Sequence, residues 1–244
     1  MAVTQACCCI PPVESNYKPV GTMETIANMS NYVVGPKDAK KLVVVIYDIF
    51  GMHNNTMQFC DRLAQQCGFR VVMPDLLHGD YWSHERMGDM DTLVAWITRV
   101  GALEVVAPEL AEVKKHLESE GFSSAGILGF CWGAKIGVAM AAEDSFYSAA
   151  TMVHPSFVDV KDAEKANAPI LALPSKDEPD MTEYMNVLRQ KPFGDKCEHH
   201  RFDDMPHGFC AARGDYTDEL NVKRATEAIQ LTANFFNKYV GAKN

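Results

Sequence analysis

Short apolar runs alternate along the chain with longer segments in which apolar residues fall three and four positions apart. A continuous apolar run of about four to eight residues is typical of a strand that is covered on both faces. Such runs predict the central strands of a buried, mostly parallel sheet, and they span residues 42–47, 69–73, 126–130, 149–153 and 169–173. A further strand is predicted near 198–202.

Helical spacing is clearest over residues 103–117, where apolar side chains line one face, and Gly121 predicts the end of that helix. The same spacing over 222–239 predicts a last helix long enough to lie across the sheet. Strands that alternate with helices imply right-handed crossover connections. We therefore predict an α/β fold with a mostly parallel central sheet and helices on both of its faces.

Length and charge narrow the class of protein. The 244 residues fit one α/β domain over 1–244, with about 1–25 forming an N-terminal arm. A formal net charge of -9 would repel nucleic acid and anionic membrane surfaces, so we expect neither as a partner. No apolar stretch is long enough for a membrane span, and no secretory signal pattern is present at the start, which predicts a cytoplasmic location. The pattern leaves monomer and homodimer open.

The chain contains eight cysteines, and a reducing compartment would keep them as free thiols. The run Cys7, Cys8 and Cys9 lacks a second Cys or His pair that could complete a zinc site, so we expect an exposed thiol cluster on the arm. The evenly spaced glycines after position 128 miss the dinucleotide-binding order. No metal and no cofactor is implied.

One predicted strand ends in the sequence Gly-Phe-Cys-Trp-Gly at 129–133 and runs directly into an Ala/Gly-rich helix. This G-x-C-x-G pattern has the spacing of a nucleophile elbow, with Cys131 in the place of the usual serine. Gly129 and Gly133 are needed because the strained turn leaves no room for side chains beside the nucleophile. The helix N-terminus favours a thiolate, and the N–H of Trp132 is placed to bind an oxyanion. A structural cysteine in a glycine turn is the alternative.

An elbow enzyme requires an acid and then a base in loops after later strands. The predicted strand at 169–173 leads to a loop with Asp177, our candidate acid, and with Glu178 and Asp180 as alternatives. The predicted strand near 198–202 leads to His207 in a Gly/Pro turn, which makes it the candidate base. These partners favour an α/β-hydrolase fold.

Three motifs together resemble the dienelactone hydrolase family, a cysteine branch of the α/β-hydrolases: residues 48–51, 129–135 and 207–209. The resemblance covers roughly 25–240, and residues 154–157 and 211–215 are similar to a fungal, AIM2-like subgroup. It implies a triad of Cys131, Asp177 and His207, and an oxyanion hole made by the backbone N–H groups of Ile49 and Trp132.

The same resemblance places Asp48 where the family has an active-site Glu that partners the resting thiol. Bacterial members carry a carboxylate-binding arginine four residues after the catalytic histidine, where this chain has Ala211 and then Arg213. Further candidates for substrate-binding or supporting roles are Tyr81, Trp82, Arg86, His154 and Phe209. Core packing is the alternative for the two aromatic residues at 81 and 82, and a solvated surface position is the alternative for Arg86.

The predicted activity is hydrolysis of a small ester or lactone through an acyl-thioester, with that small molecule as the partner of the chain. A thioesterase or another acyl hydrolase would use the same triad and differ in its pocket. A non-catalytic relative that binds a small molecule is the alternative outside the enzymes. Lys135, four residues after the nucleophile, is expected to pair with a carboxylate and to take no part in the chemistry.

Overall fold

The structure is a computed structural model that describes residues 6–241, with the side chains of Cys7, Cys8 and His84 outside the description. Within these residues one sheet contains eight strands in the order β1-β2-β4-β3-β5-β6-β7-β8. Strands β3 to β8 pair in parallel, whereas β2 pairs antiparallel with β1 and β4. The strands are β1 Thr22–Ile26, β2 Met29–Val34, β3 Leu42–Ile46, β4 Arg70–Pro74, β5 Ala125–Phe130, β6 Tyr147–Val153, β7 Ile170–Leu173 and β8 Glu198–His199.

The five central strands predicted from apolar runs are confirmed as β3 to β7, and every residue of β3, β4 and β7 is buried. The hairpin of β1 and β2 was not predicted. Its turn residues, Ala27 and Asn28, have φ values of 55° and 61°. Two positive φ values suit a two-residue hairpin turn, but such turns usually carry glycine, so the usual sequence signal is missing.

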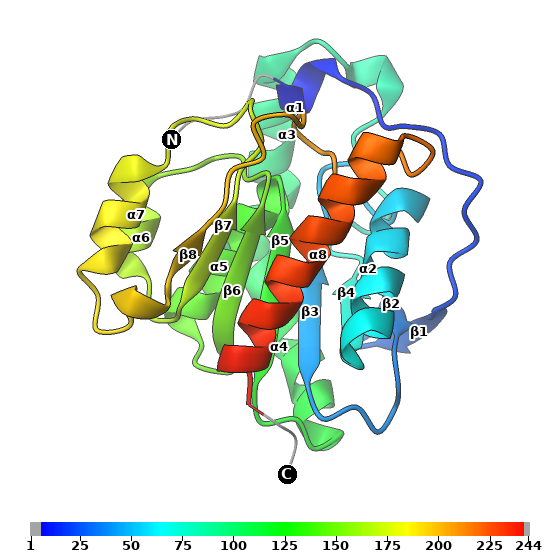
Figure 1. Cartoon of the computed structure of the whole chain (residues 1–244). Helices are drawn as coiled ribbons and strands as arrows, with labels where there is room; N and C mark the ends of the chain where they lie inside the picture. The colour runs from blue at the N-terminus through cyan, green and yellow to red at the C-terminus, as the bar shows by residue number, and fades with distance from the viewer. Residues whose placement is uncertain (1–5, 242–244) are drawn as a thin grey trace.

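Helices cover both faces of the sheet, as predicted (Figure 1). Helices α2 and α8 pack on each other and on one face, while α4 and α5 lie on the other. The helices are α1 Ala6–Cys9, α2 Asn54–Cys67, α3 Met90–Val100, α4 Leu103–Ser119, α5 Trp132–Glu143, α6 Val160–Lys165, α7 Thr182–Arg189 and α8 Glu219–Tyr239, with short 3₁₀ turns at His84–Arg86 and Gly194–Lys196. Gly121, at φ 94°, follows the end of α4.

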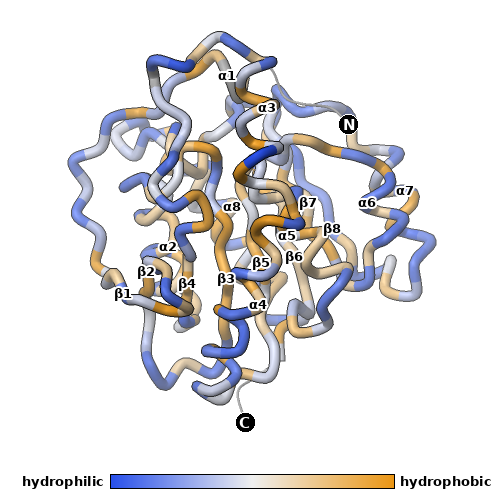
Figure 2. Tube along the Cα trace, turned by 180° about the vertical axis from the view of Figure 1, so that it is seen from behind, coloured by the Kyte–Doolittle hydropathy of each residue, from blue (hydrophilic) through white to orange (hydrophobic). Residues whose placement is uncertain are grey.

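The core lies between the sheet and these two helical layers. Seen from behind, the apolar segments gather along the central strands, and the polar segments lie on the surrounding helices and loops (Figure 2). Four residues of α4, Val106, Leu110, Val113 and Leu117, are fully buried at the spacing of one helix face. Among the described residues, no helix is long and apolar enough to span a membrane.

The N-terminal arm crosses the molecule before β1 begins at residue 22. The Val13 N–H donates to the Ala212 carbonyl at 3.0 Å, and Asn55 of α2 donates to the carbonyls of both residues. Farther along, Tyr17 Oη and the Val20 N–H both donate to Asp61, at 2.8 and 2.9 Å. The arm therefore joins α2 to the loop that follows β8, beside the carboxyl ends of the parallel strands.

Candidate active site

Cys131 occupies the tight connection between β5 and α5. Its backbone has φ 54° and ψ −116°, a conformation that L residues rarely adopt. Cys131 is buried, with 1% of its surface exposed. The Cys131 N–H donates to the Val153 carbonyl at the end of β6, and its carbonyl accepts from the Ser156 N–H at 3.0 Å. The neighbouring strand end thus holds the strained turn on both sides.

The two glycines around Cys131 are required by close backbone approach. A Cβ on Gly129 would lie 2.1 Å from the Gly133 carbonyl oxygen, and a Cβ on Gly133 would lie 2.3 Å from the Ile46 carbonyl oxygen. The second contact places the first turn of α5 directly against the end of β3. The residues that follow β3, including Ile49, therefore lie beside the beginning of α5.

This juxtaposition places the two residues predicted for the oxyanion hole, Ile49 and Trp132, on adjacent segments of the chain. Trp132 is the first residue of α5, where backbone N–H groups have no carbonyl partner within the helix. The loop carrying Ile49 is fixed from outside, because the Ile49 carbonyl accepts from the Trp82 N–H at 2.9 Å. The rings of Tyr47 and Trp132 also pack 6.3 Å apart.

His207 is fully buried, and the carboxylate that faces its ring is Glu178. His207 Nδ1 lies 2.7 Å from Glu178 Oε1, whereas Asp177 Oδ2 accepts from the His207 backbone N–H at 2.8 Å. The prediction of Asp177 as the acid is therefore wrong for the contact with the imidazole, and the alternative Glu178 takes that position. In this loop the chain turns the side chain of Glu178 inward and leaves Asp177 exposed.

The loop that carries Glu178 is held by partners that sequence reasoning missed. The second Glu178 oxygen accepts from the Ser175 N–H. Arg201 donates to the carbonyls of Lys176, Glu178 and Pro179, at 3.1, 2.7 and 3.1 Å. No local motif marks Arg201, since it acts from the segment after β8 on a loop more than twenty residues earlier.

His154 follows β6, on the strand end next to the one that carries Cys131, and its ring contacts the ring of His207. Its ring stacks on the Phe130 ring at 5.5 Å and meets the His207 ring edge-on at 5.1 Å. His154 is fully buried, and neither ring nitrogen has a hydrogen-bond partner among the described residues. Burial, followed by the nearby charge of His207, lowers the pKa of His154 well below its ordinary value of 6.5. The ring is therefore neutral.

Asp48 supports the backbone around the site. Its carboxylate accepts from the N–H groups of Phe50 at 2.9 Å and Ala212 at 3.2 Å. Burial raises the pKa of Asp48, and the charge of Arg213 opposes that rise. Arg213 is 6% exposed, stacks its guanidinium on the Phe50 ring and donates from Nε to the Ile10 carbonyl of the arm at 2.6 Å.

The other candidates divide between packed and surface positions. Trp82 is buried against Trp96, and Phe209 is buried against the ring of His154. The Tyr81 ring packs edge-on against Tyr47, two residues before Ile49. Arg86 is exposed and lies 3.4 Å from Asp80, which matches the surface alternative considered for it.

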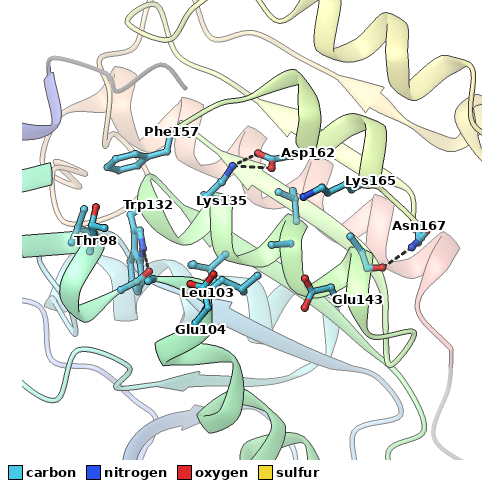
Figure 3. A pocket seen from close by; sticks show the side chains of 17 residues that line it. Thr98, Leu103, Glu104, Trp132, Lys135, Glu143, Phe157, Asp162, Lys165 and Asn167 are labelled. Atoms are coloured by element: carbon cyan, nitrogen blue, oxygen red, sulfur yellow. Dashed lines mark hydrogen bonds and ion pairs between the residues drawn. The ribbon is translucent and has the colours of Figure 1, made fainter. Parts of the chain in front are cut away.

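A cleft of about 590 Å³ lies along the outer face of α5, next to the elbow (Figure 3). Trp132 and Phe157 bound the end nearest the nucleophile, and the Trp132 indole N–H donates to the Gly101 carbonyl at 2.9 Å. On the cleft wall, Lys135 Nζ contacts both oxygens of Asp162 at 2.8 and 2.6 Å. The prediction that Lys135 pairs with a carboxylate is confirmed. Of the described residues, those lining the cleft include neither Cys131 nor His207.

Comparison with known proteins relates this site to one family. A family model described as "Dienelactone hydrolase family" matches residues 29–240. The chain belongs to the dienelactone hydrolase family. It is similar to an uncharacterized AIM2 family protein of Schizosaccharomyces pombe, at 30% identity over 88% of this chain and 89% of the relative. A protein named dienlactone hydrolase 1 from Gibberella moniliformis is 27% identical over 70% of this chain and 69% of its own length.

Among solved structures, a putative dienelactone hydrolase from Klebsiella pneumoniae superposes with a TM-score of 0.71 at 25% identity, covering 90% of this chain and 99% of that one. The resemblance inferred from the three motifs is confirmed, and so is the α/β-hydrolase fold of this dienelactone hydrolase family member. The carboxylate of Asp48 binds two backbone N–H groups, and its partnership with the resting thiol, which the resemblance implied, stays a prediction.

Proposed function

We propose that this chain is a carboxylic-ester hydrolase that cleaves a small ester or lactone with Cys131 as nucleophile, His207 as base and Glu178 as the acid. The observation that carries the proposal is the 2.7 Å contact between Glu178 and His207 Nδ1, whose side chains are both fully buried. A carboxylate on Nδ1 fixes the tautomer and orientation of the imidazole, which directs proton transfer to Nε2. Asp177, Glu178's neighbour, holds the backbone of the same histidine.

In the first half of the reaction, His207 takes the thiol proton and the Cys131 sulfur bonds to the carbonyl carbon of the ester. The negative charge that develops on the carbonyl oxygen is bound by the N–H groups of Ile49 and Trp132. The bond from carbon to the leaving oxygen then breaks, and His207 gives its proton to that oxygen. An alcohol leaves, or the ring of a lactone opens, and an acyl-thioester remains.

In the second half, His207 removes a proton from water, and the hydroxyl oxygen bonds to the thioester carbon. The carbon–sulfur bond breaks, the sulfur regains the proton from His207, and a carboxylic acid is released. Glu178 stabilises the imidazolium that forms in each half. Because the cycle needs a reduced thiol, it also supports a location in the reducing cytoplasm.

Replacement of the nucleophile tests this proposal. We expect Cys131→Ala to lower the turnover of p-nitrophenyl butyrate by about 10⁴- to 10⁶-fold, because the parts of a triad act as a unit. The control is Cys67→Ala, a thiol at the end of α2 and outside the site. Retention of most of the activity by Cys131→Ala, with the protein folded by circular dichroism, would reject Cys131 as nucleophile.

A substrate panel separates the remaining classes. The wild-type chain is assayed on p-nitrophenyl esters, an enol lactone and acyl thioesters at equal acyl length. Higher kcat/KM on oxygen esters or lactones supports the proposal, whereas a preference for thioesters would make the chain a thioesterase with the same triad. Tight ligand binding with no turnover of any of these would instead mark a non-catalytic relative.

A further inference from the structure

The ring nitrogens of His154 are polar atoms in the most enclosed part of the site, and the triad does not use them. His154 is 0% exposed, and both nitrogens are without a hydrogen-bond partner among the described residues. A buried polar group that lacks a partner is unfavourable, and native structures keep few of them. Where such a group lies in a binding site, the missing partner is commonly supplied by the ligand.

The His154 ring lies where it would contact the acyl portion of the substrate, the part that stays on the enzyme. Phe130 at the end of β5 pairs with Val153 at the end of β6. Cys131 and His154 are therefore the first residues after two neighbouring strands. The His154 ring also meets the His207 ring at 5.1 Å. A substrate group next to both Cys131 and His154 therefore belongs to the acyl portion, which remains bonded to sulfur after the alcohol has left.

The surrounding charges select a neutral group. Two buried carboxylates, Asp48 and Glu178, lie in this region, and the basic groups beside them are Arg213 and the His207 ring that Glu178 contacts. Arg213 is already engaged by the Phe50 ring and by the Ile10 carbonyl. An added carboxylate would therefore be buried close to two other carboxylates, and both basic groups already have partners. A neutral imidazole has one donor and one acceptor, which match a hydroxyl group that both donates and accepts.

From this geometry we infer that His154 forms an acyl subsite that binds a hydroxyl group on the substrate, so that the enzyme prefers esters of hydroxy acids over esters of plain or anionic acids. The inference rests on the proposed function and adds the substrate class to it. His154 is a binding residue here, and it exchanges no proton with the reacting atoms.

Three p-nitrophenyl esters of similar size test the subsite: the 3-hydroxybutyrate, the butyrate and the hemisuccinate. We expect the wild type to favour hydroxybutyrate over butyrate by about 10- to 100-fold in kcat/KM, from one buried hydrogen-bonding pair. His154→Phe keeps an aromatic ring against Phe130 and His207 but lacks nitrogen, so its preference should fall to about one. His154→Gln, which still donates and accepts, should keep part of the preference.

The control removes a comparable atom on the strand that His154 follows. Thr151 lies on β6, and its buried hydroxyl is also without a partner among the described residues. Thr151→Val should leave the ratio of hydroxybutyrate to butyrate activity unchanged. An equal loss by His154→Phe on all three esters would mean a structural role and would overturn the subsite, as would an absence of preference in the wild type.

A binding measurement keeps this test separate from the proposed function. In Cys131→Ala, 3-hydroxybutyramide should bind about tenfold more tightly than butyramide and shift the ¹⁵N resonances of the His154 ring. If the wild type hydrolyses butyrate but neither assay shows the hydroxyl preference, the subsite alone is wrong. If no ester is hydrolysed, the proposed function fails, and the amide titration still decides the subsite.

Discussion

Three carboxylates of the loop after β7 lie within four residues, and each has a different partner. Glu178 contacts the His207 ring, Asp177 accepts from the His207 backbone N–H, and Asp180 caps the N–H and hydroxyl of Thr182. Only the first contact fixes the tautomer of the imidazole. The chemical role of these residues is therefore set by the direction of each side chain.

We predict a graded loss of activity when each carboxylate is converted to its amide. Glu178→Gln should lower kcat by about 10³- to 10⁴-fold, because an amide on Nδ1 stabilises neither the imidazolium nor the required tautomer. Asp177→Asn should lower it less than about 100-fold, and Asp180→Asn should have almost no effect. Steady-state assays on p-nitrophenyl butyrate measure all three, and a larger loss for Asp177→Asn than for Glu178→Gln would restore Asp177 as the acid.

Sequence reasoning placed the elbow and His207 correctly in the fold because their signals are local. The glycine spacing around Cys131 marks the tight turn within five residues, and His207 follows from a Gly/Pro turn after a strand. The acid was not determined in this way. Its side-chain direction depends on Arg201, which binds the loop from a distant segment, and no residue spacing within the loop reports that contact.

His154 should also make stability depend on pH. In the unfolded chain it binds a proton near pH 6.5, whereas in the fold burial keeps its pKa well below that value. The unfolded state then binds more protons below about pH 6.5, so stability falls as the pH is lowered through that range. Between pH 7.5 and 5.0, the stability of the wild type relative to His154→Phe should fall by about 2 kcal/mol.

Urea unfolding at the two pH values measures this difference. The control is His78→Gln, because His78 is exposed and contacts Glu109 at the surface. That substitution should leave the pH dependence nearly unchanged. A relative stability of His154→Phe that stays constant between pH 5.0 and 7.5 would contradict a neutral, buried His154.

At the scale of elements, α5 is fixed against β3 and β5 by glycines, and two of them differ sharply in their surroundings. A Cβ on Gly133 would meet the backbone carbonyls of Ile46 and Tyr47 at 2.3 and 2.5 Å. A Cβ on Gly137, one turn later, would find its nearest neighbour at 3.6 Å, an ordinary contact with Ile127. The first position therefore sets the approach of helix and strand, while the second does not.

We predict that Gly133→Ala lowers the free energy of unfolding by about 2–4 kcal/mol, because the backbone of β3 must move to admit a methyl group. Gly137→Ala should leave stability unchanged or raise it by up to about 1 kcal/mol, since alanine favours helix. Urea unfolding curves of the two variants give the comparison. Equal stabilities would show that α5 can shift from β3 at no cost.

The same scale explains which elements were predicted and which were missed. The buried strands and α4 carry their pattern in the sequence, because burial requires apolar residues throughout β3 and along one face of α4. Strand β1 is mostly exposed, and its turn to β2 has alanine and asparagine at positive φ. A partly solvated edge hairpin imposes little apolar pattern, so the opening of the chain was read only as polar.

At the scale of the whole molecule, the N-terminal arm joins α2 to the loop that follows β8. The Ile10 carbonyl accepts from Arg213 Nε, and the Val13 N–H donates to the Ala212 carbonyl. The Ala212 N–H in turn donates to the carboxylate of Asp48. The arm is anchored farther away at Asp61, a buried carboxylate of α2. Its attachment therefore depends on a few hydrogen bonds to charged groups, each of which is stronger than a neutral one.

We predict that Tyr17→Phe frees the arm locally while the domain stays folded. The substitution removes the 2.8 Å hydrogen bond from Tyr17 Oη to Asp61 Oδ2 and leaves the ring in place. Loss of a hydrogen bond to a charged acceptor contributes about 1.5–3 kcal/mol, so local opening should increase by about 10- to 100-fold. Chymotrypsin cleavage after residue 17, followed by mass spectrometry, should accelerate by that factor, because both phenylalanine and tyrosine are substrates and cleavage follows the open population.

Two measurements separate local release from general destabilisation. Because Tyr32 also donates to Asp61 and the Val20 N–H remains bonded to it, the unfolding midpoint of Tyr17→Phe in urea should stay close to that of the wild type. Cleavage at sites outside residues 6–21 should not accelerate. If cleavage after residue 17 keeps its wild-type rate, the hydrogen bond from Tyr17 to Asp61 contributes nothing to the attachment of the arm, which its other contacts then hold.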